Sequence, residues 1–156
     1  MGEPGRMLGV DYGRKRVGIA VSDPTGLLAR GLDTLINDQT LIPKILDYVT
    51  SMAVVRIVVG KPLKLSGQEG ISAVEASRFA QNLRDRLGAE GRQNVVVVEW
   101  DERFTTTIAQ RIQIELGIKK KDRQKKSNLD RMASQLILQS YLDSHQGSGG
   151  TPRKDE

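Results

Sequence analysis

The stretch MLGVDYGRKRVGIAVSD, from Met7 to Asp23, contains two short apolar runs separated only by a turn of glycine and basic residues. The runs are Met7 to Val10 and Val17 to Val21. Two β-prone runs joined so tightly predict an antiparallel hairpin. A third strand is expected at 27–35, which would extend the hairpin to a meander.

Asp11 ends the first apolar run, where the chain enters the turn that carries Arg14, Lys15 and Arg16. A lone acid in this position has two interpretations. It caps the turn through its side-chain oxygens, or it holds a ligand that requires negative charge.

The rest of the chain alternates between helical and strand patterns. The run VVRIVV at 54–59 is almost entirely β-branched, which indicates a strand buried on both faces. Another strand is expected at 95–98, and helices are expected at 41–52, 73–87, 106–116 and 129–142. Gly88 would end the second of these helices. This order predicts an α/β fold, with a mixed five-stranded sheet and helices on both faces.

Length and composition indicate one domain. The 156 residues contain no cysteine, which excludes disulfides and thiolate metal sites. We expect a folded domain at 7–145, a flexible N-terminus at 1–6 and a disordered tail at 146–156, which is rich in glycine, serine and charge. No apolar stretch approaches the length that spans a membrane, and no signal peptide is evident. A cytoplasmic protein without a membrane partner is the expectation.

The formal net charge is +5, and the excess is concentrated in KKKDRQKK at 119–126. We expect this segment to be a basic loop. A basic segment favours a polyanionic partner, above all nucleic acid, although a solvated surface loop would have the same composition. The low aromatic content argues against recognition of single strands by base stacking.

Acidic residues stand at three places where elements begin or end. Asp11 ends the first strand, Asp101 and Glu102 follow the strand at 95–98, and Asp130 begins the last helix. On a helical wheel Asp130 falls at the edge of the apolar stripe and is aimed at the sheet. As about the second residue of its helix it would also suit the helix dipole.

Strand ends gather at one edge of an open sheet, so these acids would converge if the first strand and the strand at 95–98 are parallel neighbours. Carboxylates without histidine or cysteine suit Mg²⁺ or Mn²⁺. Acids and basic residues together point to metal-assisted phosphodiester hydrolysis. Each acid alone could equally be a turn former or a cap.

Four blocks of sequence resemble the YqgF/RuvX family, in the expected order and over nearly the whole chain. They are DYGRKRVGIAVSD, VVGKPL followed by SGQEG, DERFTT, and KKSNLDRMASQLILQSYL. Members of that family are bacterial ribonuclease H-like proteins, described as Holliday junction resolvases and as nucleases for the precursor of 16S ribosomal RNA. The resemblance implies a ribonuclease H-like fold and a divalent-metal nuclease.

Carried over residue by residue, the resemblance implies that Asp11, Glu102 and Asp130 are the catalytic acids and the metal ligands, with Asp101 as the other candidate in the D-E-R block. The residues expected to bind substrate are Arg14, Lys15, Arg16, Lys61, Arg103, Thr105, Thr106, Lys125 and Lys126. The sequence departs from the family pattern before Asp130, where SNL separates it from the nearest lysine.

Two other functions stay open at this stage. Asp11, Gly13 and Gly18 also resemble the phosphate loop of actin-like nucleotide-binding domains. A nucleic-acid-binding protein associated with the ribosome could also keep the fold without catalysis. The sequence does not choose between precursor RNA and branched DNA, or between a monomer and a homodimer.

Overall fold

The computed structural model describes residues 5–64, 66–104 and 123–146, with the side chains of the last segment described from Leu129. Five strands form one sheet: β1 Arg6–Asp11, β2 Arg16–Ser22, β3 Ala29–Ile36, β4 Val54–Lys61 and β5 Val96–Asp101. The helices are α1 Leu41–Ser51, α2 Ile71–Ala89, the short η1 Glu102–Phe104 and α4 Arg123–Gln146. The expected helix at 106–116 lies outside the described residues.

The strands lie in the order β3-β2-β1-β4-β5. β1 pairs antiparallel with β2, and β2 with β3, whereas β4 runs parallel to both β1 and β5. The predicted meander and the mixed five-stranded sheet are therefore confirmed. Because β4 separates them, β1 and β5 are parallel but are not neighbours, which corrects the arrangement considered for the acids.

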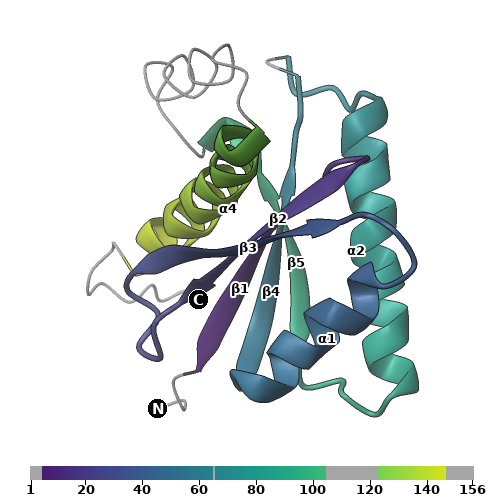
Figure 1. The fold of residues 1–156 in the computed structure, drawn as a ribbon, viewed down its shortest axis with the longest axis vertical. Coiled ribbons are helices and arrows are strands. Elements are labelled where there is room, and N and C mark those ends of the chain that lie inside the picture. The colour runs from purple at the N-terminus through teal and green to yellow at the C-terminus, as the bar shows by residue number, and fades with distance from the viewer. Residues whose placement is uncertain (1–4, 65, 105–122, 147–156) are drawn as a thin grey trace.

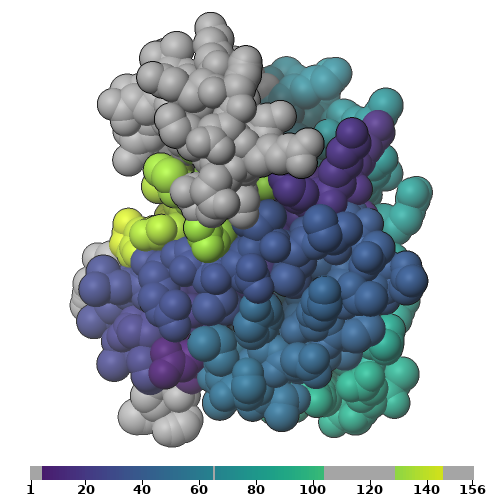
Figure 2. All heavy atoms as spheres, viewed as in Figure 1, coloured from purple at the N-terminus to yellow at the C-terminus, as the bar shows by residue number. Residues whose placement is uncertain are grey.

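Helices cover both faces of the sheet, as predicted (Figure 1). α1 and α2 pack on one face, where Leu8, Val10 and Ile57 belong to the larger apolar core. α4 packs on the other face, where Ile137, Leu138 and Tyr141 form a smaller core with Val58. Figure 2 shows β3 and α1 forming one continuous outer surface, with α2 at its edge.

Strand residues alternate between the two faces. On β1, Leu8 and Val10 point toward α1 and α2, while a Cβ added at Gly9 would lie 2.7 Å from the Leu138 Cβ of α4. A Cβ at Gly18 of β2 would lie 2.1 Å from the carbonyl oxygen of Asp130. Glycines on this face therefore let α4 approach the backbone of the sheet closely.

Two helices, α2 and α4, extend beyond their predicted bounds at both ends. α4 begins at Arg123 rather than at Leu129, so the last four residues of the expected basic loop are helical. No glycine or proline interrupts this segment, and lysine, arginine and glutamine are good helix formers. α2 continues through Gly88 to Ala89, and the turn after it uses Gly91, whose φ of 74° is left-handed.

The expected division into a domain at 7–145 with a flexible N-terminus and a disordered tail stays a prediction. β1 begins at Arg6, so the expected flexible segment 1–6 overlaps the sheet by one residue. Residues 1–4 and 147–156 lie outside the described part of the chain. Within the described part, no helix combines the length and the apolar character needed to cross a membrane.

Candidate active site

Asp11 is the last residue of β1 and lies on the face of the sheet that α4 covers. Residues of β1 alternate between the two faces: Gly9 faces Leu138 of α4, and Val10 faces the opposite core. Asp11 therefore shares the face of Gly9. Asp11 pairs across the ladder with Gly18 of β2. Because α4 passes directly over Gly18, the carboxylate of Asp11 lies at the edge of the α4 contact.

Glu102 reaches the same face from the other side of the sheet. It opens η1 directly after β5. A Cβ added at Gly60 of β4 would lie 2.7 Å from both the Glu102 Oε2 and the Ile137 Cδ1 of α4. Val10 pairs with Val59, so the next residues along these parallel strands, Asp11 and Gly60, are neighbours at the carboxyl edge of the sheet.

Asp130 approaches from α4. It lies two helical turns after Arg123, so the expectation that it begins its helix is wrong, and a role based on the helix dipole no longer applies. Its orientation toward the sheet is as predicted, since the Oδ2 accepts a hydrogen bond of 2.7 Å from the Arg16 Nε of β2. Both side chains keep partial exposure, 39% for Arg16 and 26% for Asp130.

The three predicted acids therefore come from β1, η1 and α4 and occupy one face of one sheet edge. Carboxylate oxygens are the donors that Mg²⁺ and Mn²⁺ prefer, so the chemistry of this set fits a divalent cation. Over the described ranges, however, no three Asp, Glu or His side chains lie close enough together to hold a metal ion. The Asp130 carboxylate is instead paired with the Arg16 guanidinium.

Asp101, the other candidate of the D-E-R block, faces a different partner. Its carboxylate accepts hydrogen bonds from the Arg103 side chain, at 2.7 Å from Nη2, and from the Arg103 backbone N–H, at 2.9 Å. The hydrogen bonds from the Arg103 side chain lower the pKa of Asp101, and burial opposes them. These hydrogen bonds hold the turn after β5, and they engage the Asp101 carboxylate in a local contact with Arg103.

Lys61 lies on the opposite face from the three acids, because it follows Gly60 in the alternation of β4. Its Nζ is 2.7 Å from the Glu69 Oε2 and 3.7 Å from the Glu99 Oε1. The hydrogen bond to Glu69 raises the pKa of Lys61 against the effect of burial. The phosphate contact expected of Lys61 remains a prediction, and the structure does not place this lysine with Asp11, Glu102 and Asp130.

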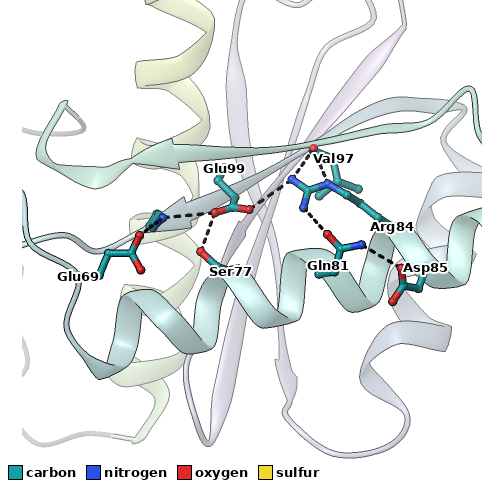
Figure 3. A network of polar contacts seen from close by, with 8 residues as sticks. Glu69, Ser77, Gln81, Arg84, Asp85, Val97 and Glu99 are labelled. Atoms are coloured by element: carbon teal, nitrogen blue, oxygen red, sulfur yellow. Dashed lines mark hydrogen bonds and ion pairs between the residues drawn. The ribbon is translucent and has the colours of Figure 1, made fainter.

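Glu99, which also faces Lys61, is the centre of a polar network with Ser77 and Arg84 (Figure 3). Its Oε1 accepts a hydrogen bond of 2.6 Å from the Ser77 Oγ, and its Oε2 lies 3.3 Å from the Arg84 Nη2. Burial acts to raise the pKa of Glu99, but the bonds from Ser77 and Arg84 and the charge of Lys61 outweigh it and the pKa is lowered. The network ties β4 and β5 to α2.

The basic residues of the turn after Asp11 contact helices on both faces of the sheet. Arg14 donates from Nε and Nη2 to the two carboxylate oxygens of Glu75 on α2, at 3.1 and 3.0 Å. Arg16 pairs with Asp130 on the other face. Lys15, between them, is exposed. Thr105 and Thr106 lie outside the described residues, and for Lys125 and Lys126 only the helical backbone is described.

The sequence singled out neither Gly60 nor the contacts of Arg14 and Arg16 with Glu75 and Asp130. Gly60 leaves the space that Glu102 occupies, and the only signal for it was its position directly after a buried strand. Glu75 and Asp130 contact arginines that are far from them in sequence, and no local pattern encodes such contacts.

Comparison with known proteins identifies relatives of the chain. The family model described as "RuvX: Holliday junction resolvase" matches residues 5–144. A protein of Syntrophus aciditrophicus is 41% identical over 88% of this chain and 88% of its own length, and one of Sulfurihydrogenibium is 37% identical over 88% and 90%. Both carry the name "Putative pre-16S rRNA nuclease".

Solved structures show the same fold. RuvC of T. thermophilus in complex with a Holliday junction substrate has a TM-score of 0.55 at 15% identity, over 92% of this chain and 97% of that one. The fowlpox virus resolvase with Holliday junction DNA gives 0.52 at 16% identity, over 90% and 98%. The fold is therefore ribonuclease H-like, as expected. Matched along almost its whole length by the family model and by close relatives, the chain belongs to the RuvX (YqgF) family of nucleases.

Proposed function

We propose that this nuclease is divalent-metal-dependent and hydrolyses phosphodiester bonds in a structured precursor of 16S ribosomal RNA. The observation that supports the proposal is that Asp11, Glu102 and Asp130 lie on the same face at the carboxyl edge of the sheet, on or against the adjacent strands β1, β4 and β2. Three separate elements supply these acids, so a purely local role such as turn capping does not account for the set.

The proposed roles follow from position. Asp11, at the end of the central strand β1, lies between the other two acids in the order of the sheet and would be shared between two metal ions. Glu102 would complete one site and Asp130 the other, and Asp130 would also orient the attacking water. A bound Mg²⁺ or Mn²⁺ would supply the charge that stabilises the attacking and leaving oxygens.

The basic residues would hold the nucleic acid. Lys15 is exposed in the β1–β2 turn, and no described residue forms an ion pair with it, so it would contact a phosphate without first leaving a partner. Arg14 and Arg16 would have to exchange Glu75 and Asp130 for phosphate. Lys125 and Lys126, at the start of α4, would contact the backbone farther from the cleaved bond.

RNA is the preferred substrate because relatives at 37–41% identity are named for it, whereas the structures solved with Holliday junctions are about 15% identical. Branched DNA is the second candidate, because the fold accommodates such junctions in those proteins. Symmetric cutting of a junction would require two copies of the chain, while processing of RNA would not.

A cleavage assay tests the proposal. Wild-type protein would meet a precursor 16S RNA with a 5′ extension, a four-way DNA junction and a plain duplex, each with Mg²⁺, Mn²⁺ or chelator. We expect cleavage of the RNA that chelator abolishes. Asp11→Asn, Glu102→Gln and Asp130→Asn should each slow it by about two orders of magnitude or more.

Asp101→Asn is the matched control, since Asp101 neighbours Glu102 but bonds to Arg103. It should retain most of the activity. Cleavage of the junction alone would replace RNA by branched DNA as the substrate. Tight binding without cleavage of any substrate would overturn the proposal and indicate a non-catalytic nucleic-acid-binding protein.

A further inference from the structure

A pocket of about 280 Å³ lies beside the β1–β2 turn, on the face of the sheet opposite to the three acids. Its lining residues include Tyr12 and Arg14 from the turn, Asn37 after β3, and Glu75, Arg78 and Asn82 from α2. Its volume is just below the range of typical ligand pockets, which begins at roughly 300 Å³. A pocket of this size suits one nucleobase rather than a larger ligand.

Stacked aromatic rings make one wall of the pocket. The ring of Tyr12 lies 4.5 Å from that of Phe79, centroid to centroid, at an interplanar angle of 26°. Phe79 is buried in the larger core, so it holds the Tyr12 ring in place. In the described part of the chain no group hydrogen-bonds to the Tyr12 hydroxyl, so this polar atom is available to a ligand.

Amide side chains add donors and acceptors of the kind that read a base edge. The Asn37 Nδ2 donates a hydrogen bond of 2.7 Å to the Gly13 carbonyl, which fixes the orientation of the amide and leaves its oxygen as the acceptor for a ligand. Asn82 is exposed on α2, opposite the turn. Glu75 contributes a carboxylate that can accept a base N–H when Arg14 moves away.

The charge at the pocket suits a phosphate. Arg78 is exposed, and among the described residues no carboxylate lies within ion-pair distance of it. Arg14, 70% exposed, is held by Glu75 at 3.0 Å. The pocket therefore offers one cation without a partner and a second that can exchange a carboxylate for a phosphate.

The pocket begins one residue after Asp11, on the other face of the sheet. Asp11 and Tyr12 are consecutive, and consecutive residues at a strand end point to opposite faces of the sheet. A nucleic-acid strand that crosses the edge at the β1–β2 turn, with its cleaved bond at Asp11, would bring an adjacent nucleotide to Tyr12. A wider groove continues from Glu75 and Arg78 past Lys64 and Pro62, which gives the strand a path onward.

We propose that this pocket binds one unpaired nucleotide flanking the cleaved bond, with its base against Tyr12, Asn37 and Asn82 and its phosphate on Arg78 and Arg14. The inference rests on the proposed nuclease function and names a feature of its substrate: single-stranded character on one side of the cleaved bond. Unstacked bases of this kind are the usual targets of RNA-binding pockets.

The test compares two RNA duplexes in chelator, one with flush ends and one with a short 5′ single-stranded extension. The extended RNA carries 2-aminopurine at each position of the extension in turn. We expect the wild-type protein to bind the extended RNA about tenfold more tightly than the flush RNA. The fluorescence should change on binding at one position of the extension.

Three variants probe the pocket: Tyr12→Phe removes the hydroxyl alone, Arg78→Gln removes the cation, and Asn82→Trp fills the pocket from an exposed helical position. Each should lower the preference for the extended RNA, with Asn82→Trp abolishing both the preference and the fluorescence change. Arg86→Gln, on the same helix and paired with Glu90 outside the pocket, should keep the wild-type preference.

Equal affinity of the wild-type protein for both RNAs would overturn the inference, as would unchanged preference in all three variants. Cleavage with Mg²⁺ separates this failure from failure of the proposed function. A wild-type protein that cleaves RNA but shows no preference contradicts the pocket alone, whereas one that cleaves nothing contradicts the nuclease proposal itself.

Discussion

The Arg16 Nε of β2 donates a hydrogen bond of 2.7 Å to the Asp130 Oδ2 of α4. This contact places a guanidinium on the acid proposed to complete a metal site. A cation that binds the Oδ2 of Asp130 must displace Arg16, and the freed side chain would then lie beside the acids, where a phosphate would be. Arg16 thus connects the proposed metal site to the proposed substrate contact.

Replacing Arg16 by glutamine should tighten the binding of Mn²⁺ while weakening the binding of RNA. The variant removes the competitor for Asp130 and also one phosphate contact. Loss of a partly exposed ion pair should cost about 1 kcal/mol of stability or less. Isothermal titration with Mn²⁺ and a filter-binding assay with RNA measure the two effects.

Arg14→Gln is the matched control for the metal effect, because Arg14 pairs with Glu75 on the other face. It should leave Mn²⁺ affinity at the wild-type value. Equal Mn²⁺ affinities for the wild type and Arg16→Gln would show that Asp130 does not exchange Arg16 for a metal.

Replacing Gly18 by alanine should destabilise the protein severely. The added Cβ would lie 2.1 Å from the carbonyl oxygen of Asp130, so the backbone of α4 would have to move away from the sheet. Overpacking of this kind costs about 1–3 kcal/mol and occasionally more. Chemical denaturation measures the loss, and Gly88→Ala, where the added Cβ meets nothing within 4 Å, is its control. Gly88→Ala should be neutral or stabilising by up to about 1 kcal/mol.

Replacing Gly60 by alanine should reduce activity more than stability. Here the added Cβ meets the ends of two side chains, Glu102 and Ile137, each at 2.7 Å, and these can rotate away. The carboxylate of Glu102 would then leave its position over Gly60 of β4. Cleavage rates and unfolding curves of the same preparation separate the two effects. A variant with wild-type activity would argue against Glu102 as a ligand.

The stability of the protein should fall in acid partly through Glu99. Its pKa in the folded protein lies below the ordinary value, so the ionised form stabilises the fold at pH above about 4.3. This contribution is lost as the pH falls through the lower pKa of the folded state. The melting temperature of the wild type should therefore drop more steeply than that of Glu99→Gln between about pH 5 and 3.

Ser77→Ala removes one of the hydrogen bonds to Glu99, so the fall of its melting temperature should be intermediate between those of the other two proteins. Parallel melting curves against pH for all three proteins would contradict the contribution of Glu99 to acid stability.

Binding of RNA should weaken steeply with salt, because the basic residues contact phosphates. Replacing Lys125 and Lys126 by glutamine together should make the slope of log K against log salt shallower by about 1.4 to 1.8. Arg92→Gln is the control, since Arg92 contacts Thr50 and Glu90 away from the acids. An unchanged slope in the double variant would exclude these lysines from the interface.

The sequence alone determined the elements and their order. Alternating and β-branched runs predicted all five strands, and the tight turn after Asp11 predicted the antiparallel hairpin, because these signals are local. The family resemblance named the acids Asp11, Glu102 and Asp130. α4 begins earlier than predicted, because the charge of the basic segment indicates a loop whereas its residues favour a helix.

Only the tertiary structure decided how those residues meet. It placed Lys61 with Glu69 and Glu99, on the face opposite to the acids, and it set Arg16 on Asp130. These contacts depend on strand order and on how closely α4 approaches the sheet. Both follow from packing between segments far apart in the chain, which no local periodicity encodes.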